Sequence, residues 1–268
     1  METVAIRNLR LSRFAVGSNP FSGFSHQTPE TDRKMLHYFS SARIKQMLAQ
    51  AESLGINTVI GRADHHIIRV LMEYWDEGGR IQWVAQTCPE LGPPENTIER
   101  AIFYGARAVY IHGGYMDFLL AQGRIGEVPP LIERIHAAGA PAGIAAHNPE
   151  VFRWAERAGL PVDFYMCSYY NSAHRDKQAE HVSGRTEWFQ EEDRRIMTEL
   201  IGTLSRPAIH YKVLAAGRND PADAFAHVAR SMRDGDAVCV GVYPERKPDM
   251  LAEDVRIFEE CLSRARAS

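Results

Sequence analysis

The sequence predicts an α/β fold of the (β/α)8 barrel class, also called a TIM barrel. Eight short apolar runs recur along the chain, stretches of helical length separate most of them, and their spacing is even. Alternating strands and helices are typical of a parallel sheet. A chain of 268 residues also matches the roughly 250 residues of such a barrel. A doubly wound open sheet is the alternative, and the even spacing favours the barrel.

The expected strands have apolar interiors and end on polar, glycine or histidine residues. The run Ala237-Val238-Cys239-Val240 has no polar face, which suits a strand that is covered on both sides. The expected strands are 13–17, 57–61, 81–86, 108–112, 142–147, 163–167, 208–212 and 237–241. Because a closed barrel gathers the carboxyl ends of its strands at one mouth, residues at these ends are the candidates for a functional site.

Capping residues indicate where the helices begin and end. We expect Ser41 to cap a helix that runs to Leu54 and stops at Gly55. Asp64 is expected to cap the next helix. Proline is tolerated in the first turn of a helix, so later helices are expected to begin near Pro94, Pro149, Pro221 and Pro248.

Two segments lie outside the regular pattern, at residues 21–33 and 172–185. The second segment is long and polar. Segments of this kind at the mouth of a barrel are either lids over the site or solvated connectors, and the sequence leaves both open.

Composition indicates one globular domain over residues 1–268. Hydrophobic residues make up 45% of the chain and charged residues 24%, and the net charge of −3 gives no electrostatic reason to expect nucleic acid. The sequence shows neither a signal peptide nor an apolar stretch that could span a membrane. The cysteines lack CxxC spacing, which favours a reducing compartment. We therefore expect a cytoplasmic protein that binds a small molecule, and a homo-oligomer is possible.

Several motifs resemble those of aldo-keto reductases, in the same order along the chain. Residues 11–17 resemble the first strand of that family, and residues 55–57 with Ala63-Asp64 resemble its second unit. Tyr110-Ile111-His112 resembles the fourth strand with its active-site histidine. The later matches are residues 162–171 for the sixth unit, 214–217 for the seventh, and 252–254 for the helix after the eighth. The chain is thus similar to a divergent member of this family.

The resemblance implies NADPH-dependent reduction of a carbonyl, but most of the expected catalytic residues are replaced. The positions of the family's aspartate, tyrosine and lysine fall near Gly61, His66 and Thr87, and only the histidine is kept, as His112. Asn148 keeps an asparagine of the nicotinamide site. NADP binding therefore stays open, whereas hydride transfer is disfavoured.

Three histidines at strand ends suggest a metal site in place of the lost residues. His66, His112 and His147 would lie around one mouth, with Asp64 or Glu90 adding a carboxylate. Such ligands suit Zn²⁺ or a similar divalent metal. Structural or substrate-binding roles are the alternative for each histidine, and Asp64 is equally suited to capping. Adjacent strand residues face opposite sides, so the sequence does not show whether His65 or His66 points inward.

Lys212 ends an apolar strand and has two interpretations. In an apolar pocket it would lose its proton and attack a carbonyl as a Schiff-base nucleophile. Otherwise it binds substrate oxygens or pairs with an acidic neighbour. Five other residues near strand ends are candidates for substrate binding, namely Arg62, Asn148, Tyr169, Asn171 and Arg218.

The sequence therefore predicts an enzyme that acts on a small sugar-like carbonyl compound by isomerisation, epimerisation or elimination. His112, Lys212 and Asp64 are the predicted catalytic residues, and the metal is held by His66, His112, His147 and Glu90. The alternatives are an NAD(P)H-dependent reductase with a rearranged catalytic set, a Schiff-base aldolase at Lys212, and a barrel that binds a sugar without catalysis.

Overall fold

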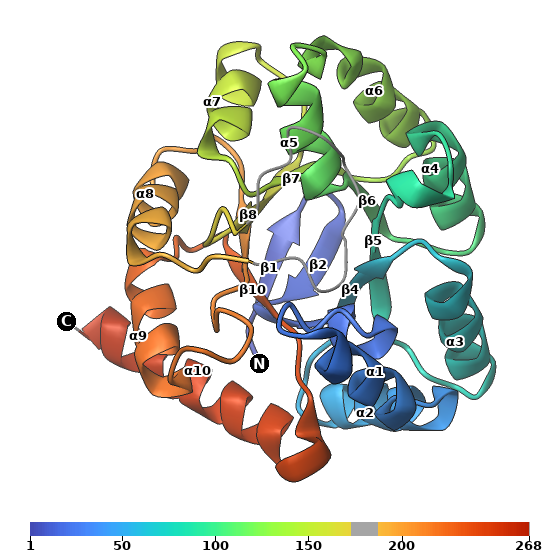
Figure 1. Cartoon of the computed structure of the whole chain (residues 1–268), viewed down its shortest axis with the longest axis vertical. Helices are drawn as coiled ribbons and strands as arrows, with labels where there is room; N and C mark the ends of the chain where they lie inside the picture. The colour runs from blue at the N-terminus through green and yellow to red at the C-terminus, as the bar shows by residue number, and fades with distance from the viewer. Residues whose placement is uncertain (173–186, 268) are drawn as a thin grey trace.

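The computed structural model describes residues 1–172 and 187–267, and these form a closed parallel barrel surrounded by helices (Figure 1). Among the described residues the barrel order is β10-β3-β4-β5-β6-β7-β8-β9. The strands are β3 (Phe14–Gly17), β4 (Thr58–Arg62), β5 (Gln82–Gln86), β6 (Ala108–Ile111), β7 (Ala142–Ala146), β8 (Phe164–Ser168), β9 (Ala208–Tyr211) and β10 (Ala237–Val240). The predicted barrel is confirmed, and the open sheet is excluded.

Side chains alternate between the barrel interior and the helical layer. Ile209 and Tyr211 of β9 pack with the interior cluster, whereas His210 between them does not. The interior combines small and large residues, and the ring of Phe164 lies directly beside Gly143 of the neighbouring strand. This alternation decides which strand-end residues face the mouth, since only every second side chain points inward.

The helices follow the strands in the expected order. They are α1 (Pro29–Tyr38), α2 (Ser41–Ser53), α3 (His65–Asp76), α4 (Pro94–Phe103), α5 (Gly113–Ala121), α6 (Pro129–Ala137), α7 (Pro149–Arg157), α8 (Glu191–Ile201), α9 (Pro221–Ser231) and α10 (Met250–Ala267). Asp64 caps α3 as predicted, because its carboxylate accepts a hydrogen bond from the backbone amide of Ile67. The cap of α2 is Ser40 rather than Ser41, because the Ser40 hydroxyl accepts the Arg43 amide.

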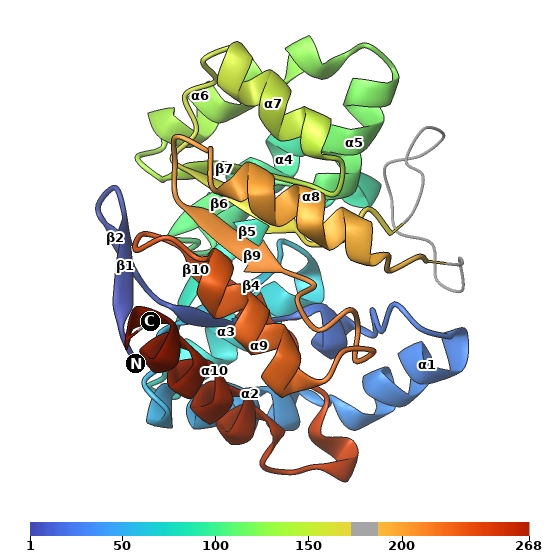
Figure 2. The ribbon, with the colours of Figure 1, turned by 90° about the vertical axis from the view of Figure 1, so that its left-hand side faces the viewer.

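A β-hairpin that the sequence did not predict covers the amino end of the barrel. Its strands are β1 (Thr3–Ile6) and β2 (Leu9–Ser12), paired antiparallel. The hairpin is visible through the barrel in Figure 1 and lies at the opposite end from α1 in Figure 2. Its inward side chains, Val4, Ile6, Leu9 and Leu11, are buried with the barrel interior.

Of the two segments outside the regular pattern, the structure describes the first in full and almost none of the second. Residues 21–33 include the end of a short 3₁₀ turn, η1 (Asn19–Ser22), and the start of α1, near the mouth. Nearly all of the 172–185 segment lies outside the described residues. In the part of the chain that the structure describes, no helix is both long and apolar enough to cross a membrane.

Candidate active site

A buried carboxylate and imidazole meet at the end of β7. The Nδ1 atom of His147 lies 2.8 Å from Oδ2 of Asp117, which comes from α5. The backbone amides of His147 and Asn148 also donate to this carboxylate, at 3.0 to 3.2 Å. Both side chains are more than nine-tenths buried. Three donors from the β7 end therefore fix the position of Asp117, and Asp117 fixes the ring of His147.

The second nitrogen of His147 faces the hydroxyl of Tyr211. A carboxylate only accepts hydrogen bonds, so Asp117 selects the tautomer with the proton on Nδ1. The Nε2 atom then carries a lone pair, 3.5 Å from the Tyr211 hydroxyl. Tyr211 reaches this position from β9, two residues after inward-facing Ile209.

Gly113 leaves room beside these two groups. A β-carbon at position 113 would lie 3.2 Å from the Tyr211 hydroxyl and 3.3 Å from Cε1 of His147. Any larger residue at this position would crowd both functional groups. We refer to Asp117, His147 and Tyr211 below as the mouth triad.

Arg62, Asp64 and Glu90 form a separate ion cluster. The Nε atom of Arg62 lies 2.9 Å from Asp64, and one of its terminal nitrogens contacts Glu90. Phe24 stacks on the guanidinium at 4.8 Å. Glu90 and Asp64 therefore neutralise Arg62. This arrangement does not fit the roles of acid or base for Asp64, of metal ligand for Glu90, and of substrate anchor for Arg62.

The predicted metal ligands do not come together. His66 is exposed in the first turn of α3, because the strand ends at Arg62 and the chain has already turned into the helix. His112 caps α5, where its Nδ1 accepts the Tyr115 amide at 3.2 Å. Among the described residues, no group of three His, Cys, Asp or Glu side chains is placed to hold a metal ion. The residues present do not fit the predicted metal, and we derive no chemistry from one.

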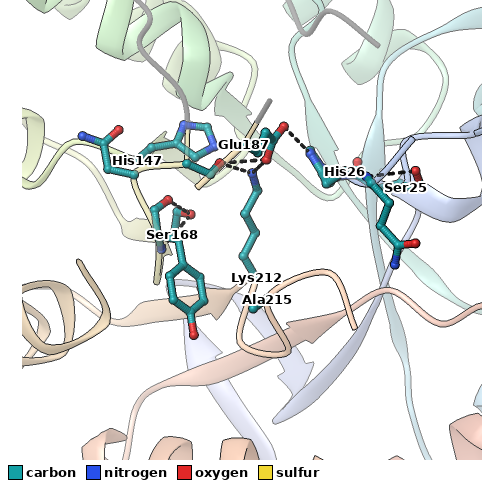
Figure 3. Close-up of polar contacts among 12 residues, drawn as sticks. Ser25, His26, His147, Ser168, Glu187, Lys212 and Ala215 are labelled. Carbon is teal, nitrogen blue, oxygen red and sulfur yellow. Dashed lines mark hydrogen bonds and ion pairs between the residues drawn. The ribbon is translucent and has the colours of Figure 1, made fainter. Parts of the chain in front are cut away.

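Lys212 lies in a polar cluster next to the mouth (Figure 3). Its Nζ atom donates to the Ser172 hydroxyl at 2.9 Å and lies 3.2 Å from Glu187. The other oxygen of Glu187 lies 2.8 Å from Nδ1 of His26. Lys212 has a φ of +58°, which ends β9 one residue earlier than predicted. Because a carboxylate stabilises the charged ammonium, this placement favours the ion-pair interpretation over the Schiff-base nucleophile.

The charge on Glu187 is held by the same contacts. Burial alone would raise the pKa of this carboxyl, but the hydrogen bond to His26 and the charge of Lys212 outweigh burial. The pKa of Glu187 therefore lies well below its ordinary value. Glu187 is therefore ionised near neutral pH.

The predicted substrate-binding residues divide between the core and the surface. Tyr169 is only 1% exposed, and its hydroxyl bonds His210 at 2.9 Å on the outer side of the barrel, so it cannot stack on a substrate in the mouth. Arg218 stacks on Phe189 and donates to backbone carbonyls. Asn148 caps α7, and with exposed Asn171 it lines a cavity next to His147.

Sequence reasoning missed Asp117 and Tyr211. Asp117 stands in the otherwise apolar helix Gly113–Ala121, and a lone carboxylate on such a helix is a signal that it has a buried partner. Tyr211 precedes the lysine that drew attention to this strand end. Its inward direction depends on the register of β9, which the sequence leaves open by one residue.

The residues at the catalytic positions of aldo-keto reductases do not fit hydride transfer assisted by that family's tyrosine, lysine and aspartate. Gly61 has no side chain, His66 is exposed on α3, and the Thr87 hydroxyl accepts the backbone amide of His112. The resemblance also implies a basic residue near Met250 that grips the 2′-phosphate of NADPH, and Lys247, which lies close to that position in sequence, is paired with Glu253. These residues supply neither the acid nor its assisting lysine and aspartate, so no step is derived through NADPH.

Comparison with known proteins supports the fold. No protein-family model and no curated protein sequence matches this chain. A presumed aldo-keto reductase from Pseudomonas aeruginosa is 17% identical, with a TM-score of 0.65 over 98% of this chain and 95% of that one. An aldo-keto reductase from Bacillus halodurans is 10% identical, with a TM-score of 0.59, and the match covers 98% of this chain and 95% of that chain. An N-acetylmannosamine-6-phosphate 2-epimerase from Clostridium perfringens is 14% identical, with a TM-score of 0.51, and the match covers 90% of this chain and 92% of that chain. At these identities the similarity concerns the fold alone, and the chain is a divergent barrel of the kind found in aldo-keto reductases.

Proposed function

We propose that this chain is an enzyme that moves a proton at the carbon next to a carbonyl group in a small polyhydroxy compound. The reaction class is isomerisation, epimerisation or β-elimination. The observation that carries the proposal is the buried Asp117–His147 pair, whose second ring nitrogen faces the Tyr211 hydroxyl in the barrel mouth.

Each member of the mouth triad has a distinct role in this reaction. Asp117 holds the imidazole and stabilises its protonated form. His147 removes the proton through Nε2, and the electrons of the broken C–H bond move into the carbonyl to form an enolate. Tyr211 donates a hydrogen bond to the enolate oxygen. Positioned general bases contribute rate factors of about 10² to 10⁴, and an oxyanion donor adds a comparable factor.

The protonated His147 completes the reaction in one of three ways. Return of the proton to the opposite face of the same carbon, after the enolate has turned over in the site, gives an epimer. For an isomer, Tyr211 protonates the enolate oxygen and the resulting tyrosinate takes the proton of the neighbouring hydroxyl, after which His147 delivers its proton to the former carbonyl carbon. Donation to a leaving β-hydroxyl releases water and gives an unsaturated product. In each case the proton and the electron pair are accounted for without a metal or a redox cofactor.

The surroundings of the mouth support a neutral hydroxylated substrate. The cations Arg62 and Lys212 are both engaged by carboxylates, and Gln86 is bonded to the Tyr110 hydroxyl at 3.0 Å. Epimerisation of a sugar derivative also has a precedent on this fold, in the Clostridium perfringens epimerase described above.

Solvent-deuterium exchange tests the proposal directly. The protein is incubated in D₂O with a panel of aldoses, ketoses and sugar acids, and loss of the signal from the proton next to the carbonyl is followed by NMR. We expect exchange with at least one compound, and a loss of about 100-fold or more in His147→Gln. The control is His66→Gln, the same change at an exposed position.

Three outcomes would contradict the proposal. Exchange that survives in His147→Gln would remove this residue as the base. Consumption of NADPH with an aldehyde, in the absence of exchange, would favour the reductase alternative. Binding of a sugar without exchange or turnover would favour a non-catalytic barrel.

A further inference from the structure

A cavity of about 800 Å³ lies between α7 and α8 and reaches His147. The mouth triad needs only the His147 end of this space. Binding sites for small ligands typically occupy about 300 to 1,000 Å³, so the cavity has room for more than the reacting group. We call it the α7–α8 groove.

The two cations that line the groove are neutralised within their own helices. Arg153 of α7 lies 2.5 Å from Glu150. Arg195 of α8 is bonded to Glu192 at 2.6 Å and to Glu199 at 2.5 Å. An anion such as a phosphate would meet a carboxylate beside each of these cations, so the groove is poorly suited to a charged ligand.

Asp193 adds one carboxylate, which accepts the Asn171 backbone amide at 3.3 Å and further disfavours an anion. The rest of the lining combines aliphatic and neutral polar groups. Ile196, Met197 and Leu200 of α8 contribute apolar surface, whereas Asn148 and Asn171 contribute amides near His147. A sugar ring presents C–H groups on its faces and hydroxyls at its edge. Such a lining matches both features, since apolar walls with a few polar groups are typical of small-molecule sites.

We propose that the α7–α8 groove binds a second, neutral sugar unit that is linked to the reacting one. The substrate would then be a neutral disaccharide or glycoside rather than a sugar phosphate. This inference rests on the proposed function, because that function places the reacting unit at His147.

Calorimetric titration of the full chain tests the groove separately from the chemistry. The probes are maltose, cellobiose and lactose, together with glucose, galactose and glucose 6-phosphate. We expect at least one of the disaccharides to bind about tenfold or more tightly than its component monosaccharides, which corresponds to about 1.4 kcal/mol. If none gains affinity, or if glucose 6-phosphate binds more tightly than every disaccharide, the proposal is overturned.

A variant that fills the groove tests whether the additional affinity for a disaccharide arises there. Thr203 is exposed and lines the groove beyond the end of α8, whereas His147 lies at the mouth where α8 begins. Thr203→Trp is therefore expected to remove the disaccharide advantage and leave monosaccharide binding unchanged. The control is Arg157→Trp, on an exposed residue at the end of α7 that does not line the groove. A disaccharide advantage that persists in Thr203→Trp would also overturn the proposal.

The two proposals fail in different ways. Disaccharide binding that Thr203→Trp abolishes, without deuterium exchange of any compound, would support the groove and contradict the proton-transfer function. Exchange of monosaccharides without any disaccharide advantage would support the function and contradict the groove.

Discussion

At the scale of single residues, the site depends on one carboxylate in an apolar helix. Asp117 is 5% exposed and accepts two backbone amides in addition to the His147 ring. A buried charge of this kind is costly unless it is fully hydrogen-bonded. Its donors come from the chain around His147, so the same bonds that stabilise the carboxylate also set the direction of the imidazole.

Asp117→Asn is expected to reduce the exchange rate by about 100-fold. The amide presents an NH₂ group where two backbone N–H groups and the ring nitrogen all need an acceptor, which also lowers stability by about 1 to 3 kcal/mol. Exchange kinetics and thermal unfolding measure the two effects. The control is Asp76→Asn at an exposed helix end, and equal activity in the two variants would contradict the role of Asp117.

Lys212→Met is expected to destabilise the fold by about 3 kcal/mol, because it removes a cation 3.2 Å from a buried carboxylate. Denaturant unfolding gives the change in free energy. Lys34→Met removes an exposed ion pair with Glu30 and is expected to have little effect. In addition, borohydride with a carbonyl ligand should not trap an adduct at Lys212, and a trapped adduct would restore the Schiff-base interpretation.

At the scale of elements, sequence patterns located the strands to within about one residue, because apolar runs and their polar ends reflect the barrel directly. The strand ends were less predictable where a single backbone angle decides them. His112 was expected inside a strand, but it caps α5 instead. His66 was expected at a strand end, but α3 begins at His65 and turns it outward.

Packing between β7 and β8 depends on Gly143. A β-carbon there would lie 2.5 Å from the ring of Phe164. Gly143→Ala is therefore expected to lower the free energy of unfolding by about 1 to 3 kcal/mol through overpacking. Gly126→Ala is the control, since a β-carbon at position 126 meets no atom within 4 Å. Equal stability of both variants would show that the barrel interior can relax around the added methyl group.

Helix α10 contains a buried acid whose ionisation opposes folding. Burial, with a further contribution from the charge of Glu253, raises the pKa of Asp254 to about 7. The folded-state pKa exceeds the unfolded value, so this residue costs nothing at low pH, and stability is lost as pH rises from about 4 to about 7. The accumulated loss is about 4 kcal/mol at most.

Asp254→Asn should therefore stabilise the protein more at pH 8 than at pH 5. Melting temperatures of both proteins at the two pH values measure the difference. Asp249→Asn, an exposed residue just before α10, is expected to show no such pH dependence. A stabilisation by Asp254→Asn that does not change with pH would contradict the raised pKa.

At the scale of the whole molecule, the barrel could be predicted from the sequence, whereas the mouth triad could not. Repeated patterns report the fold because every strand and helix contributes to them. The triad combines residues from α5, the end of β7 and the end of β9, and their meeting depends on register and on side-chain directions. Histidine, the conspicuous residue type at strand ends, identified one member of the triad and also led to the metal hypothesis.

The amino-terminal hairpin is expected to unfold together with the barrel. Leu11 is 1% exposed and packs with the barrel interior, so Leu11→Ala should cost about 2 to 4 kcal/mol. Circular dichroism and tryptophan fluorescence should report one coincident transition at a lower temperature. Arg7→Ala, at the exposed turn of the hairpin, should leave that transition unchanged. A separate early transition in Leu11→Ala would instead show that the hairpin melts on its own.

The position of the hairpin also bears on how molecules exchange with the site. Because β1 and β2 cover the amino end of the barrel, a ligand does not pass through that end to Tyr211 and His147 and approaches from the mouth or along the α7–α8 groove. Incoming substrate and outgoing product then occupy the same space around His147, with no separate exit through the amino end of the barrel. Product that has not yet left would obstruct the next substrate, so product inhibition should be competitive.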